Sequence, residues 1–125
     1  KIPLKDNSFD VVFCNHVLEH VENDKQCMKE LYRVLKPGGW GIFQVPIDWN
    51  RKETYEDKSI TSLEDREKHY WQKDHVRLYG LDYPNKLSDV GFKVEAFDYQ
   101  KHIEQSKQES YRLHKDEILY ILNKP

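Results

Sequence analysis

Near the start of the chain, three residues able to do chemistry lie close together in the sequence His16-Val17-Leu18-Glu19-His20. This H-x-x-E-H spacing occurs in zinc peptidases, where two histidines one helical turn apart bind the metal and the glutamate acts beside it. Such chemistry needs a helix over these residues and a third ligand from elsewhere in the chain. A zinc hydrolase is therefore kept as an alternative, but we predict no metal site.

The residues just before this motif predict a strand that would position it. Residues 9–14 read Phe-Asp-Val-Val-Phe-Cys, a short apolar run rich in β-formers, after a turn-like stretch at 5–8. We expect a buried strand here. Ligands of open α/β sheets bind beyond the carboxyl ends of the strands, so Asn15, His16 and Val17 are expected beside a bound ligand.

A helix and a second strand follow. Asn23 and Gln26 have the types and spacing of a helix cap, and apolar residues recur at helical spacing. These are Cys27, Met28, Leu31, Val34 and Leu35. The Pro-Gly-Gly of residues 37–39 ends the helix, and residues 40–45 predict another buried strand. Strand, helix and strand with short connections predict an α/β fold with a parallel sheet.

The rest of the chain predicts two more strands and two long connections. A helix over 82–90 precedes a strand over 92–99, and residues 117–123 read as an interior strand covered on both faces. Residues 47–80 combine charges with aromatic residues and a predicted helix at 62–72, which favours a lid or substrate-side insertion. Residues 100–116 fit either a short helix or a mobile loop.

Composition narrows the class of protein. The chain has 125 residues, enough for one ordinary domain. Its net charge is −2 with both signs interleaved, which argues against a nucleic-acid partner. No apolar run approaches the length of a membrane span and no leader is apparent, so we expect a cytoplasmic protein with no membrane contact. Cys14 and Cys27 are expected to be reduced and buried.

Several segments together resemble a known enzyme family. They are Asp6-Asn7-Ser8-Phe9-Asp10-Val11-Val12, Leu18-Glu19-His20-Val21, and Glu30-Leu31 with Arg33-Val34-Leu35-Lys36-Pro37-Gly38-Gly39. In type and spacing they resemble the class I S-adenosylmethionine-dependent methyltransferases of the methyltransferase type 11 kind. The stretch His75-Val76-Arg77-Leu78-Tyr79-Gly80 and the later Gly91-Phe92 are similar to the distal half of that family.

The resemblance implies a Rossmann-like methyltransferase sheet, truncated to strands four to seven. The implied strand order is 4-5-7-6 with the last strand antiparallel, and residues 1–125 would be the C-terminal half of the domain. The Gly-rich turn and the ribose-binding acid of the family would lie before Lys1, because glycine occurs here only at 38, 39, 41, 80 and 91. The chain is therefore expected to be a piece of a longer protein that alone binds the cofactor poorly and is inactive.

The resemblance also implies roles for individual residues. The reaction would be in-line methyl transfer from S-adenosylmethionine to an unidentified acceptor, expected to be a small molecule. Asn15, His16 and Val17 would contact the cofactor, and His20 and His75 are the candidate catalytic bases. The candidates for contacting the acceptor are Asp48, Trp49, Arg77 and Tyr79.

A different class of function stays open beside the enzyme. Without its first half, the sheet could serve as a non-catalytic interaction or oligomerisation module. The strand at residues 9–14 would then lack a neighbour on one side, and such an edge invites pairing between chains. We expect a homodimer joined through this strand edge.

Overall fold

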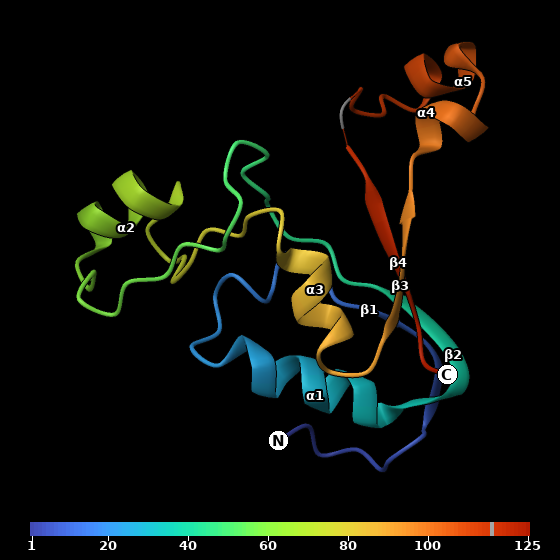
Figure 1. Cartoon of the computed structure of the whole chain (residues 1–125), viewed down its shortest axis with the longest axis horizontal. Helices are drawn as coiled ribbons and strands as arrows, with labels where there is room; N and C mark the ends of the chain where they lie inside the picture. Colours follow the sequence, from blue (N-terminus) through green and yellow to red (C-terminus); the bar gives the residue numbers. More distant parts are fainter. Residues whose placement is uncertain (116) are drawn as a thin grey trace.

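The computed structural model describes residues 1–115 and 117–125 and contains a mixed four-stranded sheet (Figure 1). In chain order, the elements are β1 (Phe9–Phe13), α1 (Asp24–Val34), β2 (Leu35–Ile42), α2 (Leu63–Tyr70), α3 (Tyr83–Ser88), β3 (Lys93–Phe97), α4 (Tyr99–His102), α5 (Gln105–Ser110) and β4 (Leu119–Asn123). The sheet order is β1-β2-β4-β3, with β1 parallel to β2 and β4 antiparallel to both of its neighbours. The predicted fold class, strand order and antiparallel last strand are confirmed.

Helix α1 forms where its sequence predicts. Asn23 caps it, and its side-chain oxygen accepts a hydrogen bond from the backbone N–H of Gln26 at 2.9 Å. The apolar stripe is buried at Met28, Leu31 and Val34. This stripe packs on the sheet and fixes where β1 and β2 meet the rest of the core.

Strand β2 begins and ends earlier in the chain than the strand predicted at residues 40–45. It begins earlier because pairing with β1 starts immediately after α1. Phe9 is opposite Leu35, and the register shifts before Val11 meets Trp40. Gly38 lies within this irregular stretch at a φ of +78°. At Gly41 a Cβ atom would come within 2.5 Å of the carbonyl oxygen of Val12, so the two strands can approach closely only with glycine there.

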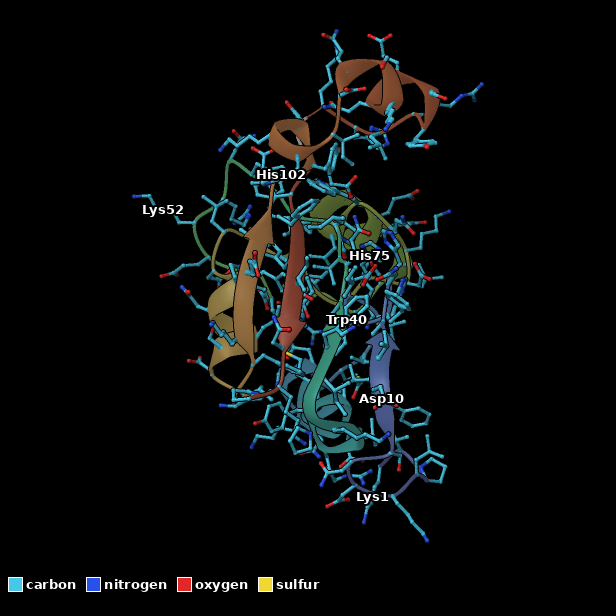
Figure 2. The ribbon with its side chains drawn as sticks, turned by 90° about the vertical axis from the view of Figure 1, so that its right-hand side faces the viewer. Lys1, Asp10, Trp40, Lys52, His75 and His102 are labelled. Carbon is cyan, nitrogen blue, oxygen red and sulfur yellow. The ribbon has the colours of Figure 1, made fainter. Side chains whose placement is uncertain are left out.

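The two faces of the sheet differ in their cover. Figure 1 shows α1 and α3 together on one side, over a core that includes Phe43, Leu87 and Leu122. The opposite face is turned toward the viewer in Figure 2, and no helix of the described residues lies across it. Phe13 is 63% exposed there, and its ring and that of Trp40 meet edge to face with centroids 5.7 Å apart.

This uneven cover corrects three expectations. Strand β1 is mostly exposed rather than buried, because it is an edge strand with one uncovered face. Strand β4 is interior in the sheet order, but Leu122 is its one fully buried residue, so it is not covered on both faces. Cys14 is buried as expected, whereas Cys27 is partly exposed on α1; both thiols are free.

Residues 47–80 form a segment tied to the core at its end. Leu78 pairs with Tyr55 through two backbone hydrogen bonds, and the buried Arg77 donates to the carbonyl oxygens of Leu18, Val21 and Glu22. Helix α2, in the middle of residues 47–80, lies away from the sheet (Figure 1).

The second long connection contains two short helices. Helices α4 and α5 lie beyond the ends of β3 and β4 in both figures. Residue 116, the last residue of this predicted connection, lies outside the described residues. Within the described part of the chain, every helix is too short or too polar to cross a membrane.

Candidate active-site cavity

A cavity of about 610 Å³ opens at the carboxyl edge of β1 and β2. Its walls come from three places: the end of β1, the chain that leaves β2, and the chain that enters β4. The lining residues are His16, Ile42, Phe43, Gln44, Val45, Pro46, Ile47, Trp49, Trp71, Tyr83, His114, Lys115, Glu117, Ile118, Leu119 and Tyr120. Apolar and aromatic side chains thus form most of the wall, with a few polar groups among them, as is usual for small-molecule sites.

The topology explains why these segments meet. Strand β4 runs antiparallel to β2, so the residues that enter β4 lie at the same edge as those that leave β2. Gln44 and Glu117, 73 positions apart, are joined there by a side-chain hydrogen bond. Sequence reasoning missed the contribution of residues 114, 115 and 117–120, although the antiparallel direction predicted for this strand was a signal that could have found them.

Behind the cavity the groups are buried and tightly bonded. The Tyr83 hydroxyl donates to the carbonyl oxygen of Phe43 at 2.6 Å, and burial raises the pKa of Tyr83 well above its usual value. Burial also raises the pKa of the Cys14 thiol to about 12, with smaller contributions from Cys27 and Glu19. Cys14 is therefore an unreactive thiol at neutral pH and part of the wall's support.

The three residues predicted to contact a cofactor differ in position. His16 lines the cavity and has a left-handed backbone with a φ of 56°, which turns the chain out of the strand. Asn15 is used locally, since its side-chain oxygen accepts from the backbone N–H of Gln44 at 3.2 Å. Val17 is exposed and is not part of the cavity wall.

Of the four residues predicted to contact an acceptor, one lines the cavity and three do not. Trp49 lines the cavity together with Trp71 from the same 47–80 segment. Asp48 shapes a turn by accepting from the backbone N–H of Asn50.

Arg77 and Tyr79 are in the core rather than in the cavity. Arg77 pairs with Glu56 at 3.0 Å, and the Tyr79 hydroxyl donates to Asp24 at 2.8 Å. Burial works to lower the pKa of Arg77, but the hydrogen bond that Arg77 donates to Glu56 and the neighbouring Tyr79 and Asp24 outweigh it, so this pKa is raised. Arg77 thus holds the segment in place and pairs with a carboxylate of that segment instead of contacting an acceptor in the cavity.

The two candidate bases are placed together, outside the cavity wall. The rings of His20 and His75 meet edge to face with centroids 4.7 Å apart. His75 is 2% exposed, and its Nδ1 lies 2.9 Å from the carbonyl oxygen of Tyr70. Neither histidine lines the cavity. His16 does, and its Nδ1 lies 3.5 Å from the Glu19 carboxylate.

The H-x-x-E-H motif does not have the geometry of a peptidase. Residues 18–20 form a turn, not a helix, so His16 and His20 do not share one helical face. Glu19 is almost completely buried beneath them. The geometry gives no support to the hydrolase alternative.

Comparisons with known proteins agree with this architecture. Residues 1–43 match the family model described as a methyltransferase domain. Over 103 residues the chain is 39% identical to cycloartenol-C-24-methyltransferase 1 of Oryza sativa subsp. japonica, covering 75% of this chain and 27% of that protein. Sterol 4-C-methyltransferase strm-1 of Caenorhabditis elegans is 28% identical over 112 residues, which cover 89% of this chain and 30% of that protein. The chain thus spans about a third or less of these relatives.

Solved structures share the fold at lower identity. Phosphoethanolamine N-methyltransferase 2 of Haemonchus contortus, in complex with phosphomonomethylethanolamine and S-adenosylhomocysteine, has a TM-score of 0.55 at 19% identity. That match covers 97% of this chain and 35% of the other. The [4+2]-cyclase SpnF has a TM-score of 0.59 at 15% identity, covering all of this chain and 54% of its own. Since a cyclase shares the fold, the fold alone does not define a reaction.

The sheet order and the cavity at its carboxyl edge fit a Rossmann-like fold, which the chain shares with solved methyltransferases. Together with the matched family model and the curated relatives, they identify the chain as a member of the class I S-adenosylmethionine-dependent methyltransferase family. S-adenosylmethionine is the cofactor of this family.

Proposed function

We propose that these 125 residues are the acceptor-side half of a longer enzyme that transfers a methyl group from S-adenosylmethionine to a small, largely apolar acceptor. The observation that carries the proposal is the 610 Å³ cavity at the sheet edge where ligands of α/β folds bind. The proposal of a longer enzyme is supported by the small share of each relative that the chain covers.

The cavity wall favours an apolar acceptor. Trp49 and Trp71 come from the 47–80 segment and face a wall that includes Phe43, Val45 and Tyr120. Two curated relatives are named as sterol methyltransferases, which fits an acceptor with an apolar ring system. We therefore place sterol-like molecules first among acceptors, with the 47–80 segment as the lid that covers them.

The chemistry asks little of the protein beyond alignment. The sulfonium of the cofactor is already a good leaving group, so in-line transfer depends on holding the methyl carbon and the acceptor atom in contact. Where the acceptor loses a proton, the group that takes it should line the cavity. His16, His114 and Glu117 are positioned for this, whereas His20 and His75 are set back from the wall.

The test uses the longer protein and measures release of S-adenosylhomocysteine with a panel of sterol, quinone and phosphoethanolamine acceptors. We expect turnover with a sterol-like acceptor, and for Trp49→Ala a rise in the acceptor KM of about tenfold, equivalent to 1.4 kcal/mol of lost contact. Trp40→Ala is the matched control, because Trp40 lies on the uncovered face of the sheet. Release only with phosphoethanolamine, or an unchanged KM in Trp49→Ala, would contradict the proposed acceptor.

A second measurement addresses the proposed division of the cofactor site. If the Gly-rich turn and ribose-binding acid lie on the other half, calorimetry should find binding of S-adenosylmethionine to the 125-residue chain weaker than micromolar. Micromolar binding by this chain alone would show that it holds the cofactor without the other half.

A further inference from the structure

Glu19 has no satisfactory partner for its charge. Its side chain is 2% exposed, and neither carboxylate oxygen accepts a hydrogen bond from any described residue. A buried carboxylate without hydrogen bonds or a paired cation is costly. Whatever compensates it must approach from the side where the histidines lie.

Besides the exposed His16, whose Nδ1 lies 3.5 Å from Oε1, two histidines from different parts of the chain lie around this carboxylate. His20 follows Glu19 directly, and His75 comes from the end of the 47–80 segment. Glu19, His20 and His75 each offer one ligand atom, and the three atoms lie within 4.8 Å of one another.

The hydrogen bonds of both rings fix where their protons are. Nδ1 of His20 lies 3.2 Å from the carbonyl oxygen of Asp74, and Nδ1 of His75 lies 2.9 Å from that of Tyr70. A carbonyl oxygen only accepts, so each Nδ1 carries a proton. In the neutral rings, each Nε2 therefore presents a lone pair.

That arrangement directs the lone pair of His20 toward an anion. Nε2 of His20 is 3.8 Å from Oε1 of the buried Glu19 carboxylate. A lone pair facing a carboxylate oxygen is repulsive unless a cation lies between them. Backbone carbonyls that orient metal-binding histidines through Nδ1 are also the usual outer support of a metal site.

We infer that Glu19, His20 and His75 form a binding site for a divalent transition metal, with Zn²⁺ the best match to two imidazoles and one carboxylate. Three protein ligands leave a fourth position for water. Ligand atoms around a tetrahedral zinc lie roughly 3.3–3.6 Å apart, so the three side chains close by roughly 1 Å on binding.

The site joins two distant segments, which gives it a structural consequence. Glu19 and His20 belong to the turn after β1, and His75 belongs to the end of the 47–80 segment. A metal held between them pins that segment to the sheet and adds its binding free energy to stability. This role does not rest on methyl transfer, because neither cofactor nor acceptor takes part.

The experiment is a titration of the chelator-treated 125-residue chain with Zn²⁺ alone, followed by calorimetry, and with Co²⁺, followed by visible absorption. We expect one equivalent bound, with the intense Co²⁺ bands of a tetrahedral site. Glu19→Gln and His20→Ala should each weaken Zn²⁺ binding at least about tenfold. His102→Ala is the matched control, because His102 lies on α4 and stacks on Phe97, outside the cluster of Glu19, His20 and His75.

A second readout separates loss of the site from loss of folding. Amide exchange at residues 74–78 should slow when Zn²⁺ is added to the wild-type chain, and should not change in His20→Ala, whose ring is partly exposed and tolerates truncation. Absence of one-equivalent binding would mean that no metal compensates Glu19. Binding that survives Glu19→Gln and His20→Ala, or that His102→Ala weakens equally, would show adventitious surface sites only. Either result overturns the inference.

Discussion

The two faces of the sheet carry similar side chains but give them different surroundings. On the helix-covered face, Leu122 of β4 and Phe43, which follows β2, are buried in the same core cluster as apolar residues of α1 and α3. On the other face, Phe9, Val11 and Phe13 repeat every second residue along β1 and are exposed. Alternating apolar residues in a strand thus show that one face of the sheet is suited to burial. Whether that face is buried depends on whether another element or another chain packs on it.

The largest effect should come from truncating the covered face. Leu122→Ala should lower the free energy of unfolding by about 2–5 kcal/mol, because it leaves a cavity in a fully buried site. Phe13→Ala removes a larger side chain from the uncovered face and should cost only about 0.5 kcal/mol. Urea denaturation of both variants measures the difference. Equal losses would mean that the second face is covered in solution.

A smaller effect is expected for substitutions on the uncovered face of the sheet, which should change self-association of the chain. We predict that the chain forms a dimer joined through residues 9–14, because β1 is an unpaired edge strand with an exposed apolar face. Light scattering at tens of micromolar should give the dimer mass, and Phe13→Lys should shift the chain to monomer.

Leu63→Lys is the control for this prediction, since Leu63 is equally exposed but lies on α2. A wild-type chain that is monomeric at these concentrations, or a Leu63→Lys variant that dissociates as readily, would remove β1 from the interface.

The cavity edge should be less protected than either face. In the absence of ligand, amides of residues 47–80 should exchange at least about tenfold faster than those of residues 40–45, as expected for a lid. Within the segment, Leu78 and Asp48 should be the slowest, because both are bonded to the backbone of a paired residue. Exchange as slow throughout 47–80 as in 40–45 would make the segment a fixed layer.

The smallest effect concerns acid and the covering helix α1. The hydrogen bond from Arg33 on α1 is the main cause that lowers the pKa of Glu30 from 4.5 to about 2, helped by the backbone N–H of Ile2. Since the folded pKa lies below the unfolded value, this pair contributes stability above pH 4.5 that is lost as the pH falls toward 2.

The check is a pair of urea titrations at pH 5.5 and pH 3 on wild type and Glu30→Gln. The wild-type chain should lose more of its free energy of unfolding between the two pH values than the variant. An equal loss in both would show that the carboxyl of Glu30 does not contribute to the acid sensitivity of the fold.

The helices were predicted well from the sequence because the interactions that start them join residues only a few positions apart. Asn23 caps α1 and Ser62 caps α2 through side-chain bonds within three residues, which spacing alone reveals. The strand order came from the family resemblance. The prediction that β1 is buried was wrong because the sequence Phe-Asp-Val-Val-Phe shows only that the strand is suited to burial. It does not show whether other elements pack on the strand.

The site was less predictable because its residues meet through long-range packing. His16 follows a strand end and was found from that position, whereas Trp49 was found as an aromatic residue of the 47–80 segment. Arg77 and Tyr79 look like ligand contacts in sequence, yet they lie in the core, where Arg77 satisfies three carbonyl oxygens. No local pattern shows whether a polar side chain turns inward to hold the backbone or outward to hold a ligand.

Strand β4 joins β2 to β3, although it is the last of the described elements in the chain. On the ribosome, β2 therefore waits for its partner while the intervening residues are made. Gly41 pairs with Leu122, 81 positions later, and at 5–20 residues per second this takes roughly 4–16 s. Until β4 is made, the β1–β2 pair and, once it is synthesised, β3 are separate pieces of the sheet, and each presents open hydrogen-bonding groups to chaperones and to neighbouring chains.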